Sequence, residues 1–284
     1  MPYIDHPLGR TYYQRRGRKT AGGLPLVCVH GGPGGDSKHM APLFDLSDER
    51  QVYLYDQIGG GRSSPTEKRR WNVRTFVREL ATLVDAWGLE EFHLFGASWG
   101  TTLALEYTLK HPRRVRSLVF QSPMFSTADW EADANRLIAQ LPADDQKVLR
   151  YCHEIGATDA EVYKSVMLTY YLRHVCRRKA KLLEMYRDAT PNGQKIYAHM
   201  WGPSEFKSTG TLKAHDKVSR LADVTQPALV ICGEFDEAQP RTGERYASLL
   251  PAGDFVCISN ASHVILAEQP TKLVRAVRSF LRDS

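Results

Sequence analysis

The chain has 284 residues, of which 42% are hydrophobic and 25% charged, and its formal net charge at pH 7 is +6. This composition is typical of a folded globular protein and argues against disorder, and no apolar run approaches the ~20 residues of a membrane helix. The length fits one large α/β domain, or a core with an inserted subdomain.

The first part of the chain predicts strands and helices in alternation. Short apolar or alternating runs bounded by turn residues indicate strands, and apolar residues at a spacing of three and four indicate helices. In chain order, these patterns predict strands over 3–16, 24–29, 51–55, 91–95 and 115–120, and helices over 73–87 and 101–110.

The middle of the chain is different, because from about residue 124 to about residue 215 only helical patterns occur. They cover 130–141, 144–155, 159–173, 179–188 and 194–200. The alternation then resumes, with strands over 228–232 and 255–258 and helices over 241–250 and 271–281.

Alternating strands and helices predict a mostly parallel sheet with helices on both faces. We therefore interpret 124–215 as an all-helical cap inserted into an α/β core formed by 1–123 and 216–284. A separate second domain is the weaker interpretation, since the α/β pattern returns after the helical block.

One turn organises this prediction. The segment 92–102 contains Gly96, Ser98 and Gly100 between a predicted strand and a predicted helix. In that context Gly-x-Ser-x-Gly indicates a nucleophile elbow, a tight turn that exposes a serine hydroxyl at the end of a sheet. A serine hydroxyl also needs a base, and the base needs an acid that fixes its tautomer.

Two later loops supply candidates for these partners. Asp236 lies four residues past the strand that ends at Cys232, and His263 lies five residues past the strand that ends at Ile258. Each alone could be a helix cap or a surface histidine. Together with Ser98 they follow the chain order Ser, Asp, His that is typical of an α/β-hydrolase.

Acyl transfer also requires hydrogen-bond donors for the developing oxyanion. The backbone N–H of Trp99, directly after the serine, is one candidate. The other is Gly32, in the glycine-rich loop 30–35 that follows an early strand. The alternative for that loop is a flexible turn, which five small or proline residues in succession make the weaker interpretation.

Other function classes find little support. The positive charges are scattered, and we interpret the densest group, Arg173 to Lys181, as a solvated helix face; no nucleic-acid or membrane partner is therefore expected. The sequence has no His-Glu-x-x-His and no phosphate-binding loop motif, so no metal and no cofactor are expected.

The cysteines and the N-terminus bear on the compartment. Five cysteines, an odd number, show no Cys-x-x-Cys spacing, and Cys28, Cys232 and Cys257 lie in predicted core strands. Residues 1–20 are polar and basic with no apolar region after them, which is unlike a secretory signal. A reducing, cytoplasmic location is expected. The oligomeric state stays open.

Six motifs together resemble the proline iminopeptidases (prolyl aminopeptidases) of the serine α/β-hydrolase type, and most closely the cytosolic branch with the tricorn-interacting aminopeptidase and amino-acid amidases. They are His-Gly-Gly-Pro-Gly at 30–34, Asp-Gln-x-Gly-x-Gly-Arg-Ser at 56–63, Gly-x-Ser-Trp-Gly at 96–100, Gly-Pro-x-Glu-Phe at 202–206, Gly-Glu-x-Asp-Glu at 233–237 and Ser-His at 262–263.

The resemblance implies an α/β-hydrolase fold with Ser98, Asp236 and His263 as catalytic triad and with the Gly32 and Trp99 N–H groups as oxyanion hole. It also implies that Glu205 and Glu237 bind the free amino group of the substrate. A protonated N-terminal proline has two N–H donors, and two carboxylates can accept one each.

Four activities remain to be compared. The first is a serine aminopeptidase that releases N-terminal proline, or another small apolar residue, from short peptides. The second is an amino-acid or proline amide hydrolase with the same triad. A generic esterase and a binding protein without catalysis are the weaker alternatives. Aromatic residues of the cap are expected to form its core rather than a substrate pocket: Tyr163, Tyr170, Tyr171, Tyr197 and Trp201.

Overall fold

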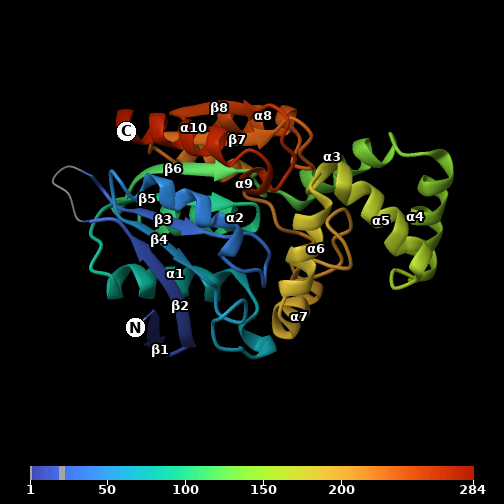
Figure 1. The fold of residues 1–284 in the computed structure, drawn as a ribbon, viewed down its shortest axis with the longest axis horizontal. Helices are drawn as coiled ribbons and strands as arrows, with labels where there is room; N and C mark the ends of the chain where they lie inside the picture. Colours follow the sequence, from blue (N-terminus) through green and yellow to red (C-terminus); the bar gives the residue numbers. More distant parts are fainter. Residues whose placement is uncertain (1, 19–22) are drawn as a thin grey trace.

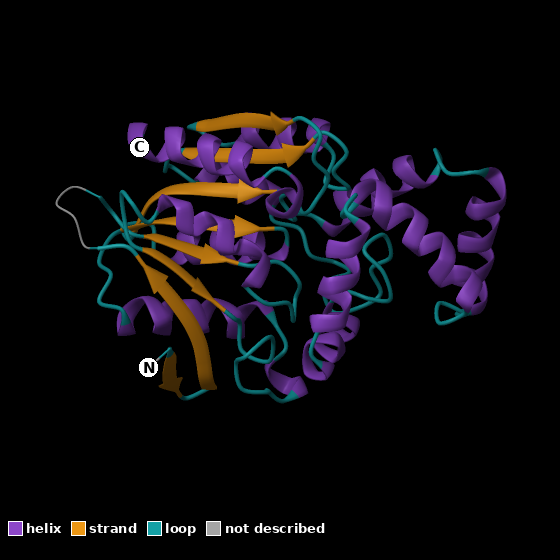
Figure 2. Ribbon diagram, viewed as in Figure 1, coloured by secondary structure: helices purple, strands orange, loops and turns teal. Residues whose placement is uncertain are grey.

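The computed structural model describes residues 2–18 and 23–284, and this part of the chain contains one eight-stranded sheet (Figures 1 and 2). The strand order is β1-β2-β4-β3-β5-β6-β7-β8. The strands β4, β3, β5, β6, β7 and β8 run parallel to one another, whereas β1 pairs with β2, and β2 with β4, in the antiparallel sense. Their bounds are β1 Tyr3–His6, β2 Gly9–Arg16, β3 Leu26–Val29, β4 Val52–Tyr55, β5 Phe92–Ala97, β6 Val115–Gln121, β7 Ala228–Gly233 and β8 Gly253–Ile258.

Helices cover both faces of this sheet, as predicted. The helices α1 (Val73–Ala86), α2 (Trp99–Lys110) and α8 (Pro240–Leu249) pack on one face. The helix α10 (Pro270–Asp283) and the 3₁₀ helix η1 (Lys38–Leu46) pack on the other. Successive side chains of a strand point to opposite faces, so β3 contributes alternately to the two cores and is buried throughout.

Five α-helices and then the 3₁₀ helix η3 (Val218–Asp223) lie between β6 and β7 in the chain, and the five α-helices stand beyond the arrowheads of β5 to β8 (Figures 1 and 2). Their bounds are α3 Thr127–Ile138, α4 Ala143–Ile155, α5 Glu161–His174, α6 Lys179–Asp188 and α7 Pro191–Met200. Helices α3 to α6 share a second hydrophobic core, to which Phe206 and Val264 also contribute. Helix α7 instead packs Ile196 and Met200 into the core on the α1 and α2 side of the sheet.

The basic side chains at 173–181 are exposed, as predicted, but they do not lie on one helix face. Helix α5 ends at His174 and α6 begins at Lys179, and Val175 between them is buried. The N–H of His263 donates to the carbonyl of His174 at 3.0 Å, and the N–H of Val264 donates to that of Val175 at 2.9 Å. This basic segment therefore contains a turn at Val175 whose backbone carbonyls bind the loop that carries His263, the candidate base.

Cys257 also departs from the prediction, because its side chain is exposed rather than part of the core. It lies on β8, the last strand of the sheet order, where less structure covers the strand. Cys28 and Cys232 are buried as predicted. In the described part of the chain, no helix has both the length and the apolar character needed to cross a membrane.

Candidate active site

The turn at Ser98 joins β5 to α2 and has the strained backbone of a nucleophile elbow. Ser98 has φ 53° and ψ −123°, a conformation that L-residues other than glycine rarely adopt. A Cβ on Gly96 would lie 2.5 Å from the carbonyl oxygen of Gly100, and a Cβ on Gly100 would lie 2.2 Å from that of Val29. The two glycines therefore let the strand, the turn and the helix approach closely enough to form this turn.

His263 and Asp236 meet beyond the ends of β8 and β7. His263 Nδ1 lies 2.8 Å from Asp236 Oδ1, which also accepts the N–H of Ala238 at 2.9 Å. Asp236 Oδ2 accepts the Ser122 hydroxyl at 2.6 Å and the N–H of Gly233 at 3.2 Å. The carboxylate is thus fixed by four donors in a fully buried position, which orients the imidazole.

The electrostatics of His263 suit a base that must stabilise a positive charge. Burial acts to lower the pKa of His263, but the charge and hydrogen bond of Asp236, together with the charge of Glu205, raise it above its ordinary value. The ring also makes an edge contact with the indole of Trp130, at 5.4 Å between centroids. Among the described residues no hydrogen bond joins Ser98 Oγ to His263, a bond that in enzymes without substrate is often long.

The glycine-rich loop after β3 lies against the elbow. A Cβ on Gly31 would be 3.1 Å from the Cβ of Ser98, and Gly32 has φ 129°. Gln57, which follows β4, binds this loop: its side chain donates to the His30 carbonyl at 2.8 Å and accepts the Trp99 indole N–H at 2.9 Å. The structure therefore brings the glycine-rich loop that contains Gly32 and the first turn of α2 together at Ser98.

A second network explains the motif at 56–63. Asp56 accepts the hydroxyl of Ser37 at 2.6 Å and the Nε–H of Arg62 at 2.8 Å. Burial acts to raise the pKa of Asp56, but the hydrogen bonds from Arg62 and Ser37 lower it to about 2. Asp56 is therefore ionised at neutral pH, and it fixes the loop 56–63 against the segment that follows the glycine-rich loop.

Glu237 is the least compensated acid of the site. Its side chain is fully buried, and neither carboxyl oxygen has a hydrogen-bond partner among the described residues. The buried Tyr170 hydroxyl interacts with Glu237 and acts to lower its pKa, although the two groups make no hydrogen bond of ordinary geometry. Burial, and then the charges of Glu205 and Asp236, raise the pKa of Glu237 well above its ordinary value. A buried carboxyl in this condition favours a cationic partner.

Glu205, in the segment after α7, lies near enough to Glu237 and His263 to affect their pKa values. The Trp130 indole N–H donates to the Glu205 carbonyl at 2.8 Å, and the Glu205 N–H donates to the Tyr171 hydroxyl at 2.8 Å. Burial raises the pKa of Glu205, and the charge of His263 opposes this rise. The backbone of Glu205 is thus held close to Trp130, the residue that contacts the His263 ring.

Two positioning residues could not be inferred from the sequence. Besides its bond to Asp236, Ser122 has φ 52°, and Gln121 donates from its side-chain amide to the His263 carbonyl at 3.0 Å. Both stand where β6 ends, next to the elbow in the sheet. Their only signal in the sequence is that they follow a predicted strand directly.

Tyr163, Tyr170 and Tyr171 belong to the core of the cap, as predicted, whereas Trp201 and Tyr197 pack on the core of the sheet. Tyr163, Tyr170, Tyr171 and Trp201 are buried. Tyr197 is partly buried and packs on the core of the sheet. Three of these rings lie against Phe206, the neighbour of Glu205, with centroid separations of 4.8 Å to Tyr170, 6.1 Å to Tyr163 and 6.3 Å to Tyr171.

The fold and the site define the class of protein, since the sequence profile of the α/β hydrolase fold family matches residues 25–270. A proline iminopeptidase of Heyndrickxia coagulans is 38% identical over 285 residues, covering 99% of this chain and 98% of that protein. The chain belongs to the proline iminopeptidase family of α/β-hydrolases.

Solved structures agree with this assignment. The crystal structure of a proline iminopeptidase of Mycobacterium smegmatis has a TM-score of 0.90 at 31% identity, over 99% of this chain and 97% of that one. The crystal structure of VinJ has a TM-score of 0.92 at 30% identity, with the same coverage. The predicted α/β-hydrolase fold is confirmed.

Proposed function

We propose that this chain is a serine aminopeptidase that removes N-terminal proline from short peptides. The observation that carries the proposal is Glu237, a fully buried carboxyl group with two unpartnered oxygens, in the described part of the chain, beside Glu205 and the His263–Asp236 pair. A protonated N-terminal proline supplies two N–H donors and one positive charge, which matches two carboxylates. The names of the proline iminopeptidase relatives favour this activity over the amide hydrolase.

In the proposed reaction, His263 Nε2 accepts the proton of the Ser98 hydroxyl while Oγ attacks the first carbonyl of the peptide. The N–H groups of Gly32 and Trp99 donate to the oxyanion that forms. The imidazolium then gives its proton to the leaving nitrogen as the C–N bond breaks. Water, deprotonated by His263, hydrolyses the prolyl ester of Ser98 and restores the enzyme.

Asp236 stabilises the imidazolium, and its four hydrogen bonds keep the ring aligned through both steps. The two glutamates set the register of the substrate, because a chain that continues beyond the amino group has no charge to offer Glu237. Cleavage is therefore limited to the first peptide bond.

We also propose that residues 124–215 act as one cap that carries Glu205 to a core built from 1–123 and 216–284. The hydrophobic core shared by α3 to α6 supports this division for these helices, whereas α7 joins the cap to the core of the sheet. A reducing compartment such as the cytosol is the proposed location, because all five cysteines are free thiols.

The decisive test of the chemistry is Ser98→Ala, assayed with a prolyl arylamide. Loss of nearly all turnover, with an unchanged circular dichroism spectrum, is the expected result. Retention of most of the activity would show that Ser98 is not the nucleophile.

A further inference from the structure

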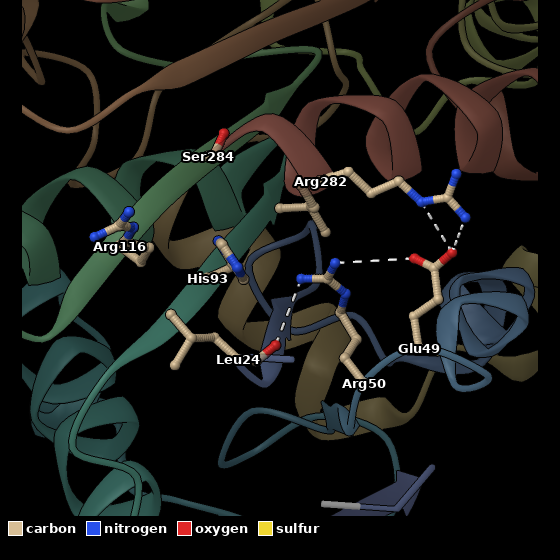
Figure 3. A pocket seen from close by; sticks show the side chains of 8 residues that line it. Leu24, Glu49, Arg50, His93, Arg116, Arg282 and Ser284 are labelled. Carbon is tan, nitrogen blue, oxygen red and sulfur yellow. Dashed lines mark hydrogen bonds and ion pairs between the residues drawn. The ribbon is translucent and has the colours of Figure 1, made fainter. Parts of the chain in front are cut away.

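A cavity of about 520 Å³ lies where the parallel strands begin, at the opposite ends of these strands from Ser98 (Figure 3). Its lining residues come from the amino ends of three parallel strands: Leu24 precedes β3, His93 is the second residue of β5, and Arg116 is the second residue of β6. Arg50 precedes β4, and Arg282 comes from the end of α10. Nothing in the proposed reaction uses this cavity.

Arg50 stands in the middle of these residues (Figure 3). It is only 5% exposed, and its hydrogen-bonding capacity is poorly used. One terminal nitrogen lies 3.5 Å from the Leu24 carbonyl, the other lies 3.9 Å from Glu49, and Nε–H is buried without an acceptor in the described part of the chain. A buried guanidinium donor without an acceptor is costly, so an acceptor is expected at this position.

The charges around Arg50 also favour an anion. Glu49 is shared with Arg278 at 2.6 Å and with Arg282, and Asp48 pairs with Arg278 at 3.0 Å. Burial, together with the charges of Arg278 and Arg282, lowers the pKa of Arg50 despite Glu49 and Asp48. The acids near Arg50 therefore compensate its charge incompletely.

The remaining groups at the cavity do not change this balance. Arg116 has only a loose pair with Glu91, at 3.9 Å between two half-exposed side chains. Burial and the charges of Arg50 and Arg116 lower the pKa of His93 to about 3, so this ring is neutral. Ser284 also lines the cavity, and its hydroxyl donates to the Phe280 carbonyl at 2.7 Å.

We propose that this cavity binds a small organic oxyanion, with a carboxylate or phosphate group on Arg50 and with Arg116 and Arg282 at its rim. A guanidinium presents a planar fork of donors that fits two oxygens of such a group. Leu24 and Leu281 give the cavity an apolar wall for the carbon part of the ligand. The site is independent of the proposed peptidase activity.

The test is a titration of the whole protein with inorganic phosphate and with citrate at constant ionic strength. The Arg50 Nε–Hε resonance, assigned through Arg50→Lys, should shift on binding. Arg116→Gln should weaken binding about tenfold, since one charge-assisted contact is lost, and Arg50→Lys should weaken it further. Prolyl arylamide hydrolysis should be unchanged in Arg116→Gln.

The matched control is Arg74→Gln with Arg78→Gln, which removes two exposed arginines of α1 and should leave binding within about twofold of the wild type. Tighter binding of phosphate assigns phosphate esters, and tighter binding of citrate assigns carboxylates. Failure of both anions to move the Arg50 resonance would overturn the proposal. Equal weakening in Arg116→Gln and in the α1 control would also overturn it, because only net charge would then matter.

Discussion

Replacing Glu237 by glutamine tests how the substrate amine is recognised. The change keeps the shape of the side chain and removes its charge from a fully buried site. One charge-assisted hydrogen bond to the ammonium is worth about 1.5–3 kcal/mol, so kcat/KM for a prolyl arylamide should fall about 10- to 100-fold. The slow hydrolysis of an N-acetylated analogue should stay within about twofold, because that substrate has no charge to lose.

Although Glu237→Gln should lower activity, it should raise the free energy of unfolding at neutral pH. The folded-state pKa of Glu237 is raised, so its contribution to stability is present below the unfolded pKa of ~4.3 and is lost as pH rises through the folded pKa. Glu237→Gln removes this loss, and its free energy of unfolding relative to the wild type should therefore increase from pH 5 to pH 8. Denaturant unfolding at the two pH values measures the difference.

Glu234→Gln is the matched control, since Glu234 lies in the same loop, is exposed, and binds only the Asn260 N–H in the described part of the chain, at 2.8 Å. It should leave the kinetics unchanged. The reasoning is refuted if Glu237→Gln keeps the wild-type kcat/KM for the prolyl arylamide. It is also refuted if free and blocked substrates lose turnover equally.

Three further predictions concern the triad and the elbow. Ser122→Ala should lower the free energy of unfolding by about 1.5–3 kcal/mol and reduce kcat, because Asp236 loses a hydrogen-bond donor. Ser122→Gly should reduce kcat to the same extent. It should be about 1 kcal/mol more stable than the alanine variant, because φ at this position is 52° and glycine adopts that conformation without strain. Unequal kcat values would contradict a role for the hydroxyl. The acid limb of kcat/KM should lie above pH 6.5, because His263 must be neutral and its pKa is raised; Asp236→Asn should move the limb to lower pH, and an unmoved limb would assign it to another group. Gly100→Ala should cost about 3 kcal/mol or more in thermal or denaturant unfolding, because its Cβ would meet the Val29 carbonyl at 2.2 Å, and wild-type stability would contradict this close approach of helix and strand.

Much of the fold was predictable because it follows from local patterns. Every strand of the parallel part of the sheet and every long helix overlaps an element predicted from the sequence, and α6 begins and ends where it was predicted. The positions of Ser98, Asp236 and His263 were predictable for a related reason. Parallel strands bring their carboxyl ends to one edge, so loops distant in the chain meet there.

What was missed depends on contacts that no local pattern contains. The bond from Ser122 to Asp236 spans 114 residues, and its geometry requires a left-handed residue directly after β6. Cys257 is exposed because β8 is an edge strand of the sheet, and the apolar periodicity of a sequence does not reveal the order of strands in a sheet. The turn at Val175 could not be predicted from the surrounding basic residues, because it binds the His263 loop through backbone carbonyls rather than side chains.

The central claim is that Ser98 acts only on substrates whose free amine reaches Glu205 and Glu237. The most direct measurement is the ratio of kcat/KM for prolyl arylamide to that for N-acetylprolyl arylamide, on one preparation of the wild-type enzyme. Two charge-assisted bonds predict a ratio of about 100 or more. A ratio near one would contradict the account and would indicate an esterase-like site that ignores the amine.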